Sequence, residues 1–453
     1  MKPQSKLDAG LHSPCVEKPA AAMMRRPAYT EFLAAKSREV APAGIVAPAI
    51  HGSLFGFQSA IVRWALARGR SAIWADCGLG KTRMALEWAK ALVHNGGNAL
   101  ILTPLAVSHQ FQMEADELGT PITICRGEGD ATKGINVINY ERLHKIDTSA
   151  FNAVVCDESS ILKDYTSATR NMLIETFGRT PYRLALTATP APNDVMELGN
   201  HAEFLGVMSR SEMLAMYFVH DSSETQKWRL KKHARSEFWR WVSEWAVALR
   251  SPRDVGHDDA GYDLPPLNVS VHAVDAAHDI STGTLFALPA QTLGDQRKAR
   301  RDSLPLRLSK VVGLVNASDE PWVVWCDLNI ESEEASHAIR GAVQVTGSQS
   351  IDEKESIIAG FTAGKYRVIV TKPSICGHGV NWQHCSRVAF LGVSHSFEQW
   401  YQAIRRCYRF GQRSPVECHL VVSSREVAVL ENLKRKQQDA QTMIGELSQH
   451  ASL

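Results

Sequence analysis

The segment ADCGLGKT, at residues 75 to 82, ends with the residue types and the spacing of a phosphate-binding loop. It follows the apolar run Ala72-Ile73-Trp74 and precedes a helical pattern that begins at Met84. Backbone N–H groups at a helix start bind phosphate, Lys81 can reach the β and γ oxygens, and the Thr82 hydroxyl can ligate Mg²⁺. The segment therefore predicts a bound nucleoside triphosphate with contacts at Gly78, Gly80, Lys81 and Thr82.

Ala75 stands where the usual loop pattern has its first glycine. That glycine serves the turn and adds no side chain to the phosphate, so alanine is tolerable wherever φ stays negative. The alternative is a glycine-rich turn without a ligand. The apolar run before it and the helical pattern after it favour the phosphate loop.

Two adjacent carboxylates, Asp157 and Glu158, follow the apolar run AVVC at residues 153 to 156. A strand that ends there would place Asp157 to hold Mg²⁺ through its hydration shell, and Glu158 to orient and deprotonate the attacking water. The alternative is a helix N-cap with a second acidic residue near the helix dipole. Because the same chain carries a phosphate loop, we predict that the pair serves hydrolysis.

The segment QAIRRCYRFGQ, at residues 402 to 412, carries a second set of charged residues. A helix would put Gln402, Arg406 and Arg409 on one face, and Gly411 would end that helix. Arginines presented from a separate domain suit a planar, permanently charged clamp on a transferring phosphoryl group. A basic helix exposed to solvent would show the same spacing, and spacing alone does not separate the two.

A loop at residues 374 to 385, SICGHGVNWQHC, contains glycines that allow close approach of the backbone to a ligand. It also contains four residues of metal-ligating types, Cys376, His378, His384 and Cys385. Their spacing fits none of the usual structural zinc patterns, so we predict a loop that leaves a strand, without zinc.

Strand-like apolar runs alternate with helical patterns in two parts of the chain. Between residues 51 and 205 the runs are SAIWA, NALILTP, INVINY, NAVVCDE and YRLALTATP, and from residue 311 they are PWVVWCD, AVQVTGS, YRVIVTK, RVAFLGV and CHLVVSS. Continuous runs of this kind are typical of parallel strands with helices on both faces. The sequence therefore predicts two doubly wound α/β domains.

The other segments are expected to support these domains. Residues 1 to 50 are predicted to form a loosely ordered arm with a short helix at 29 to 36. Residues 206 to 310 are predicted to form a helical insertion and linker, with LPPLNVSVHAVD as a turn into an alternating strand. One amphipathic helix in this insertion is expected to carry Phe238, Trp241, Val242, Trp245 and Leu249.

Composition limits the classes of protein to which the chain can belong. With 453 residues, of which 44% are hydrophobic and 22% charged, the chain is typical of a globular protein with two or three domains. No apolar stretch approaches the roughly 20 residues that span a bilayer, and the N-terminus has no apolar leader. Nine cysteines without C-x-x-C pairs fit reduced thiols, so we expect a cytoplasmic protein.

Taken in order, these segments resemble the motifs of the superfamily-two helicases, in the Swi/Snf-type translocase branch and its compact phage and prophage forms. FGFQSAIVRWAL resembles the leading motif, with Gln58 positioned for adenine, and LILTPLAVSHQF resembles motif Ia. DESS resembles a DEAH-like box, LALTATPAPN motif III, GHGVNWQHC motif V and QAIRRCYRFGQ motif VI. The chain departs from the family at Ala188 and Arg405, where glycine is usual.

The resemblance implies two tandem RecA-like lobes with an ATP cleft between them, lobe one at residues 51 to 205 and lobe two at 311 to 453. It implies catalytic roles for Lys81, Asp157, Glu158, Gln402, Arg406 and Arg409, and coupling of hydrolysis to movement through Thr187 and Thr189. It implies nucleic-acid contacts at Thr103, Pro104, Ser108, Asn139 and Tyr140 in lobe one, and at Thr346, Gly347 and Asn381 in lobe two.

Two basic runs could extend the nucleic-acid track. QKWRLKKHAR, at residues 226 to 235, contains Trp228, which could stack a base. A solvated helix whose tryptophan packs on lobe one is an equal alternative, and RKARR at 297 to 301 is ambiguous in the same way.

The sequence thus predicts an ATP-dependent DNA helicase or translocase that uses ATP and Mg²⁺. Contacts to phosphates position a protein without reading sequence, so binding should be indifferent to sequence. The alternatives are an RNA helicase of the same superfamily and a nucleic-acid-binding scaffold without turnover.

Overall fold

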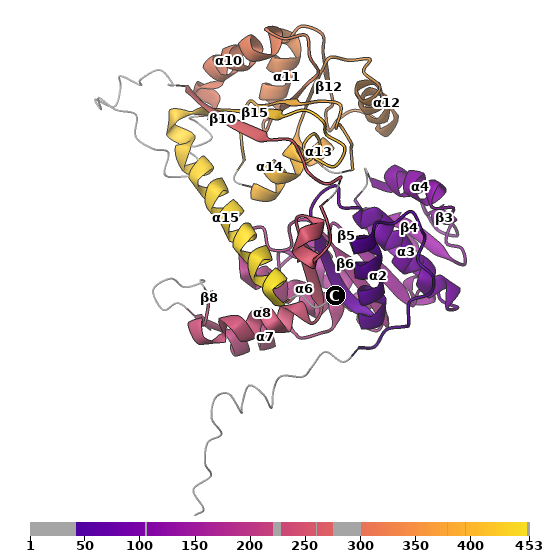
Figure 1. The fold of residues 1–453 in the computed structure, drawn as a ribbon. Helices are drawn as coiled ribbons and strands as arrows, with labels where there is room; N and C mark the ends of the chain where they lie inside the picture. Colours follow the sequence, from indigo (N-terminus) through magenta and orange to yellow (C-terminus); the bar gives the residue numbers. More distant parts are fainter. Residues whose placement is uncertain are drawn as a thin grey trace, which may run out of the picture. The chain divides into compact units, whose positions relative to one another are not determined.

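The computed structural model describes residues 42–104, 107–220, 228–259, 261–274, 300–377, 379–394 and 396–450. These residues form two parallel β-sheets with helices around them (Figure 1) and one antiparallel pair, β7 (Phe218–His220) with β8 (Trp228–Leu230). Most of the predicted N-terminal arm, including its helix at 29 to 36, lies outside the described residues.

The first sheet has seven parallel strands in the order β3-β4-β2-β5-β6-β1-β9. Its strands are β1 (Arg70–Ala75), β2 (Ala99–Thr103), β3 (Ile122–Ile124), β4 (Ile135–Asn139), β5 (Ala153–Asp157), β6 (Tyr182–Leu186) and β9 (Ala246–Leu249). Its helices are α2 (Gly56–Arg68), α3 (Lys81–His94), α4 (Ser108–Glu117), α5 (Ala168–Phe177), α6 (Leu198–Leu205), α7 (Arg210–Tyr217) and α8 (Arg235–Ser243).

Helices bury both faces of the first sheet. Consecutive strand residues point to opposite faces, so Ile73 packs in one apolar cluster with Trp88 of α3, and Trp74 packs in the other with Phe204 of α6. Figure 1 shows α2 and α3 side by side, where both contribute to the cluster that contains Ile73. The continuous apolar runs therefore reflect a doubly wound sheet, which confirms the predicted fold class.

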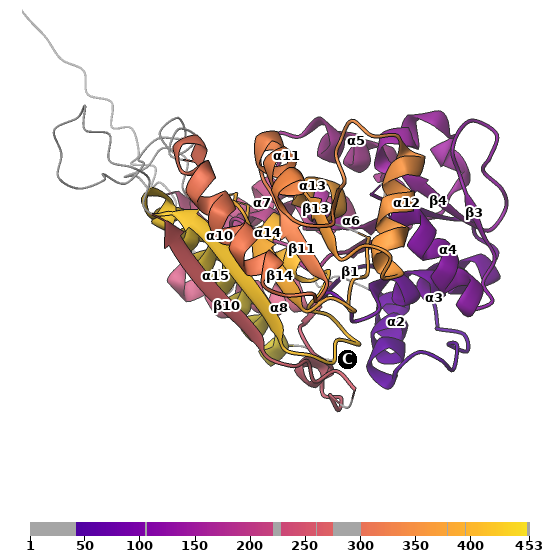
Figure 2. The same ribbon diagram turned by 90° about the horizontal axis from the view of Figure 1, so that it is seen from above.

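The second sheet has six parallel strands in the order β10-β15-β14-β11-β13-β12. Its strands are β10 (Leu267–Val274), β11 (Trp322–Trp325), β12 (Ala342–Gln344), β13 (Val368–Thr371), β14 (Arg387–Phe390) and β15 (Val416–Ser423). Its helices are α10 (Leu304–Asn316), α11 (Asn329–Ala338), α12 (Ile351–Thr362), α13 (Pro373–Cys376), α14 (Phe397–Ile404) and α15 (Val427–His450). Helix α10 runs beside β15 (Figure 2) and shares an apolar cluster with α11 on one face of this sheet.

An ion pair with no solvent exposure joins α10 to α11. Arg307 Nη1 lies 2.9 Å from Glu331 Oε1, and both side chains are fully buried. Arg307 Nε also donates to Ser303 Oγ at 3.0 Å, while Glu331 Oε2 accepts the backbone N–H of Leu328 at 3.0 Å. The pair therefore fixes the first turn of α11 against the first turn of α10.

Alanine in place of Glu331 is expected to destabilise the second domain by about 3–5 kcal/mol, because Arg307 would remain buried without a counter-ion. Thermal unfolding of the variant would measure this loss. Glu334→Ala, which removes an exposed carboxylate from the same helix, is the matched control and should unfold at the wild-type temperature. An equal melting temperature for both variants would show that the pair contributes little.

The segment between residues 206 and 310 adds a strand to each sheet. The predicted helix through Leu249 is wrong in its second half, since α8 ends at Ser243 and residues 246 to 249 form β9 beside β1. Pairing with β1 decides the local structure there, because Val247 and Leu249 fill one face and Ala246 the other. β10, predicted as an alternating strand, pairs with β15. Both sheets therefore extend past the predicted boundaries at 205 and 311.

The C-terminal helix α15 takes part in the cores of both domains. Leu430 and Leu433, near its start, pack in a core cluster of the second domain. Met443 and Leu447, near its end, pack in a core cluster of the first domain, where Glu446 also forms a 2.8 Å ion pair with Arg235. α15 thus links the two domains. Within the described ranges, no helix combines the length and apolar character that crossing a membrane requires.

Candidate active site

The phosphate loop connects the end of β1 to the start of α3, as its sequence predicts. Gly78 and Gly80 have φ angles of 87° and 80°, in the left-handed region that favours glycine. A Cβ at Gly80 would also lie 2.2 Å from Gln58 Nε2, and one at Gly78 would lie 2.9 Å from the backbone N of Phe410. Glycine is therefore required at both positions by conformation and by close approach.

Lys81 and Gln58 bond the backbone of this loop. Lys81 Nζ donates to the carbonyl of Ala75 at 2.8 Å and to that of Asp76 at 3.3 Å. The Gln58 amide, predicted to contact adenine, is buried; it donates to the Leu79 carbonyl at 3.0 Å and accepts the N–H of Phe55 at 3.0 Å. Gln58 thus links the start of α2 to the phosphate loop by hydrogen bonds. Thr82, half-buried in the first turn of α3, follows Lys81.

The acidic pair lies at the same edge of the sheet as the phosphate loop. Asp157 ends β5 and is opposite Leu186 of β6, and Leu186 is opposite Ile73 of β1. Glu158 follows with φ 51°, the only positive φ at a non-glycine residue in the described part of the chain. Its Oε2 atom is buried and has no hydrogen-bond partner among the described residues. A strained backbone that presents an unsatisfied carboxylate is typical of a functional position.

Burial and the neighbouring Glu158 raise the pKa of Asp157 to about 7, while Lys81 opposes the rise. A desolvated pair of carboxylates is costly when charged, and a divalent cation offsets that cost. Carboxylate and hydroxyl oxygens are also the ligands that Mg²⁺ prefers. The side chains of Thr82 and Asp157 therefore fit a magnesium ion.

Two residues that sequence reasoning did not assign to catalysis support this edge. The Tyr140 hydroxyl, expected to contact nucleic acid, is buried and donates to the Asp157 carbonyl at 2.5 Å. His201 of α6, which no motif marked, lies 3.1 Å from the Pro190 carbonyl through Nε2 and 3.5 Å from Ser159 Oγ through Nδ1. Burial lowers the pKa of His201 to about 4, so the ring is neutral and joins the segments after β5 and β6.

The coupling candidates lie in the segment that directly follows β6. Thr187 Oγ1 accepts the N–H of Thr189 at 3.1 Å, and both residues are buried. Thr189 Oγ1 has no hydrogen-bond partner among the described residues. Because buried hydroxyls are usually satisfied, this oxygen is a candidate for a contact with a bound ligand.

The arginine segment differs from its predicted form. α14 ends at Ile404, so the expected helix through Gly411 is wrong, and residues 405 to 411 form turns. Beyond Ile404 the chain contacts the loop after α13, where the Arg406 carbonyl accepts the N–H of Trp382 at 2.9 Å. This loop still brings the predicted residues together, since Arg406 and Arg409 each donate to the Val380 carbonyl at 3.3 Å.

Side chains of the second domain reach the phosphate loop. Arg406 Nη2 lies 3.7 Å from Cys77 Sγ, and that thiol lies 3.4 Å from Gln402 Oε1. Arg406 also donates to Gln402 Oε1 at 2.7 Å. Burial and the neighbouring Arg406 lower the pKa of Arg409 to about 10, so Arg409 is still charged at neutral pH.

Two buried donors in this cluster have no acceptor among the described residues. Gln402 Nε2 and Arg409 Nε are buried and lack a hydrogen-bond partner among the described residues. Buried donors are usually satisfied, so a polar ligand with acceptor oxygens would complete them. A phosphoryl group fits that requirement.

The candidate nucleic-acid residues of the first lobe bond one another at the ends of β2 and β4. Asn139 Nδ2 donates to Ser108 Oγ at 3.0 Å and to the Pro104 carbonyl at 3.3 Å. Thr103 is fully buried and donates to the Pro104 carbonyl at 2.8 Å. Because their side chains are buried, Thr103, Asn139 and Tyr140 are placed to support this end of the sheet, whereas Pro104 and Ser108 are half-buried and can reach a nucleic acid.

The second-lobe candidates lie closer to solvent. Thr346 is half-buried, with its hydroxyl 3.1 Å from that of Ser348, and Gly347 and Asn381 are exposed. The Gly347 carbonyl accepts Lys354 Nζ at 2.8 Å. Exposed amide, hydroxyl and lysine groups can all bind a phosphate backbone.

The two basic runs have structural partners where they are described. Trp228 begins β8 and is partly buried against a core cluster of the first lobe, and Lys231 donates to the Ala215 carbonyl at 3.0 Å near the end of α7. Arg300 forms ion pairs with Glu426, at 2.9 Å, and with Asp327. Residues 226, 227 and 297 to 299 lie outside the described residues.

Cysteines of the predicted metal-free loop belong to the second core. Cys376 accepts a hydrogen bond from Thr371 Oγ1 at 3.4 Å, and the Cys385 thiol lies 3.2 Å from the Pro321 carbonyl. No three metal-ligating side chains gather within the described ranges, which do not include His378.

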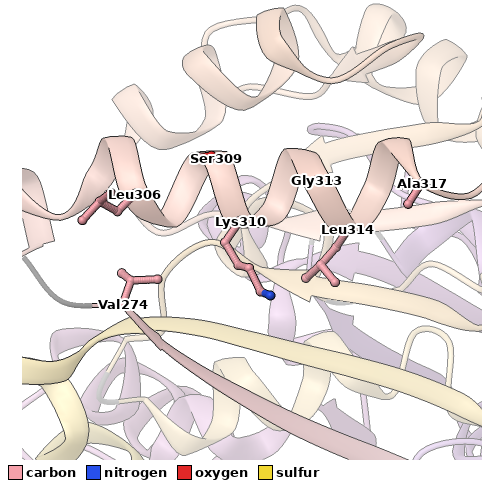
Figure 3. Close-up of a pocket in the computed structure, with 7 residues that line it drawn as sticks. All are labelled: Val274, Leu306, Ser309, Lys310, Gly313, Leu314 and Ala317. Atoms are coloured by element: carbon pink, nitrogen blue, oxygen red, sulfur yellow. The ribbon is translucent and has the colours of Figure 1, made fainter.

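The second domain also has an apolar groove of about 780 Å³ between α10 and the end of β10 (Figure 3). It is lined by Val274, Leu306, Ser309, Lys310, Gly313, Leu314 and Ala317. None of these residues belongs to a motif, so the groove is separate from the candidate active site.

Comparison with known proteins identifies both domains. A model of the SNF2-related domain matches residues 57–217, and a model of the helicase conserved C-terminal domain matches residues 308–411. Putative protein p41 of Acyrthosiphon pisum secondary endosymbiont phage 1 is 21% identical over 445 residues, covering 84% of this chain and 96% of the relative. The Sulfolobus solfataricus SWI2/SNF2 ATPase core, solved in complex with dsDNA, is 18% identical with a TM-score of 0.42, covering 90% of this chain and 99% of that one.

The two domain models together span the phosphate loop, the acidic pair and the arginine segment. These are the elements that a nucleic-acid-dependent ATPase of this kind uses. The chain is therefore a nucleic-acid-dependent ATPase that belongs to the Snf2-related branch of the superfamily-two helicases.

Proposed function

We propose that the chain uses ATP and Mg²⁺ to translocate along DNA without reading its sequence. The observation that carries the proposal is the 3.7 Å approach of Arg406 to Cys77, because it joins the second lobe to the phosphate loop. Hydrolysis would then depend on both lobes. Lobe one is assigned to residues 51 to 205 with β9 added, and lobe two to residues 311 to 453 with β10 added.

Within this site, each residue has a distinct role. Lys81 would bind the β and γ phosphates, while Thr82 and Asp157 would hold Mg²⁺, which neutralises charge on the phosphates. Glu158, whose Oε2 lacks a partner among the described residues, would accept a proton from the attacking water. Arg406 and Arg409, with Gln402, would stabilise charge on the transferring phosphoryl group.

ATP hydrolysis would be coupled to nucleic-acid binding through residues at the carboxyl ends of strands in the first sheet. Thr187 and Thr189 follow β6 directly, and buried Asn139, at the end of β4, donates to Ser108. Half-buried Pro104 and Ser108, together with Thr346, Gly347 and Asn381 of lobe two, suit contacts to a phosphate backbone. A change in lobe closure would then shift one set of contacts relative to the other.

ATPase assays with duplex DNA, single-stranded DNA and RNA test this proposal. We expect duplex DNA to stimulate turnover most, with two duplexes of unrelated sequence giving equal affinity and equal dependence on salt. Equal stimulation by RNA would favour the RNA helicase. ATP binding without stimulation by any nucleic acid would instead favour a scaffold without turnover.

A further inference from the structure

A carboxylate inside the phosphate loop is bound by the second lobe. Arg405 Nη2 forms an ion pair with Asp76 Oδ2, and the exposed fractions of the two side chains are 15% and 5%. The Tyr401 hydroxyl donates to the other oxygen, Asp76 Oδ1, at 2.5 Å. That oxygen also accepts the N–H of Cys77 at 2.6 Å. Two side chains from lobe two therefore bind one acidic residue of the loop.

Arg405 is held rigidly in this position. Its guanidinium lies over the rings of Tyr401 and Tyr408, 5.2 and 5.1 Å from their centroids, and Nη1 donates to the Tyr408 carbonyl at 3.3 Å. Cation–π contacts strengthen when they are desolvated. The geometry therefore favours one orientation of the guanidinium, toward Asp76.

The Arg405–Asp76 pair is next to Arg406, which is proposed to stabilise charge on the transferring phosphoryl group. Arg406 follows Arg405 directly, and its Nη2 atom lies 3.7 Å from the thiol of Cys77, the residue after Asp76. Glycine, the usual residue of the resembled family at position 405, could not form this ion pair. The contact is thus a property of this chain's own sequence.

We propose that Arg405 is a positioning residue, which fastens the arginine segment to the phosphate loop through Asp76 and so sets Arg406 against the γ-phosphate. This inference rests on the proposed function. Arg405 also neutralises a carboxylate that would otherwise repel a bound triphosphate. Loss of the anchor should lower kcat, whereas loss of the neutralising charge should raise the KM for ATP.

Arg405→Ala should lower kcat, because Arg406 loses its anchor, and raise the KM for ATP, because Asp76 is left unpaired beside the phosphates. Adding Asp76→Asn to Arg405→Ala should restore KM but leave kcat low. Arg405→Lys should give values between wild type and Arg405→Ala, since it keeps the charge and loses the planar fork. A residue that served only stability would give no such separation of KM from kcat.

Alkylation of Cys77 tests the same contact without any turnover. The other described cysteines are buried, whereas Cys77 is half-buried under Gln402 and Arg406. With N-ethylmaleimide as the probe, and label at Cys77 measured by peptide mass spectrometry, we expect Arg405→Ala to be labelled about tenfold faster than wild type. Arg413→Ala, which removes an exposed arginine directly after the arginine segment, should react at the wild-type rate.

The two assays separate the possible failures. Unchanged labelling in Arg405→Ala and Arg405→Lys, or a KM that Asp76→Asn does not restore, would overturn the role of Arg405. Faster labelling in a protein whose wild type shows no stimulated ATPase would leave the contact intact and refute the proposed function. Thermal unfolding of each variant identifies a loss of fold, and Arg405→Lys then carries the test.

Discussion

Glutamine in place of Glu158 is expected to abolish measurable ATP turnover while ATP still binds. The Oε2 atom of Glu158 is buried and unpartnered among the described residues, and the amide of glutamine cannot accept a proton from water. Loss of a general base lowers a rate by about 10²- to 10⁴-fold. Phosphate release would measure kcat, and equilibrium binding of a fluorescent ATP analogue would measure affinity.

Two further variants show whether the effect is specific to the carboxylate of Glu158. Lys81→Ala should lose binding as well as turnover, because it removes a phosphate ligand instead of the base. Glu175→Gln, an equivalent change at an exposed carboxylate of α5, should leave both quantities unchanged. Wild-type turnover in Glu158→Gln would remove the carboxylate from its proposed role.

Arg409→Ala is expected to slow hydrolysis by about 10³-fold or more with ATP affinity nearly intact, as for an arginine that acts in the transition state. Of the two arginines, Arg409 is the better one to substitute, because fewer other contacts would be lost. Arg406 also bonds the Gln402 side chain, whereas the hydrogen bond found for Arg409 in the described structure is the one to Val380. Its Nε is free to donate to a phosphoryl oxygen.

Single-turnover measurements at saturating nucleic acid would give the rate of the chemical step, with binding measured separately. Arg435→Ala, at an exposed position on α15, is the control for general loss of positive charge. A fall in affinity as large as the fall in rate would contradict an action confined to the transition state.

Both sheets could be predicted from sequence because their strands are buried on two faces. That burial leaves continuous apolar runs, as in residues 153 to 157, which local composition reveals. The phosphate loop and acidic pair were likewise visible, since strand, loop and helix are consecutive there. For these elements the sequence pattern was sufficient, because residues that are consecutive in the chain form the site.

Long-range contacts explain the differences. AVAL at 246 to 249 continues a helical spacing, and only its pairing with β1 makes it a strand. Beyond Ile404 the arginine segment bonds the loop that contains Trp382, and His201 bonds Pro190 and Ser159, the second of which lies 42 residues away. Burial of Thr103 is likewise decided by tertiary packing, which a motif does not record.

Helix α15 has a mechanical consequence for any motor built on this chain. Drawing Met443 and Leu447 out of the first core would cost about 3–6 kcal/mol for two large apolar side chains. Wide separation of the lobes is therefore unfavourable. If the chain translocates as proposed, each ATP cycle is expected to move the lobes only as far as these two side chains can stay buried, and this helix would then limit the length of each step along the nucleic acid.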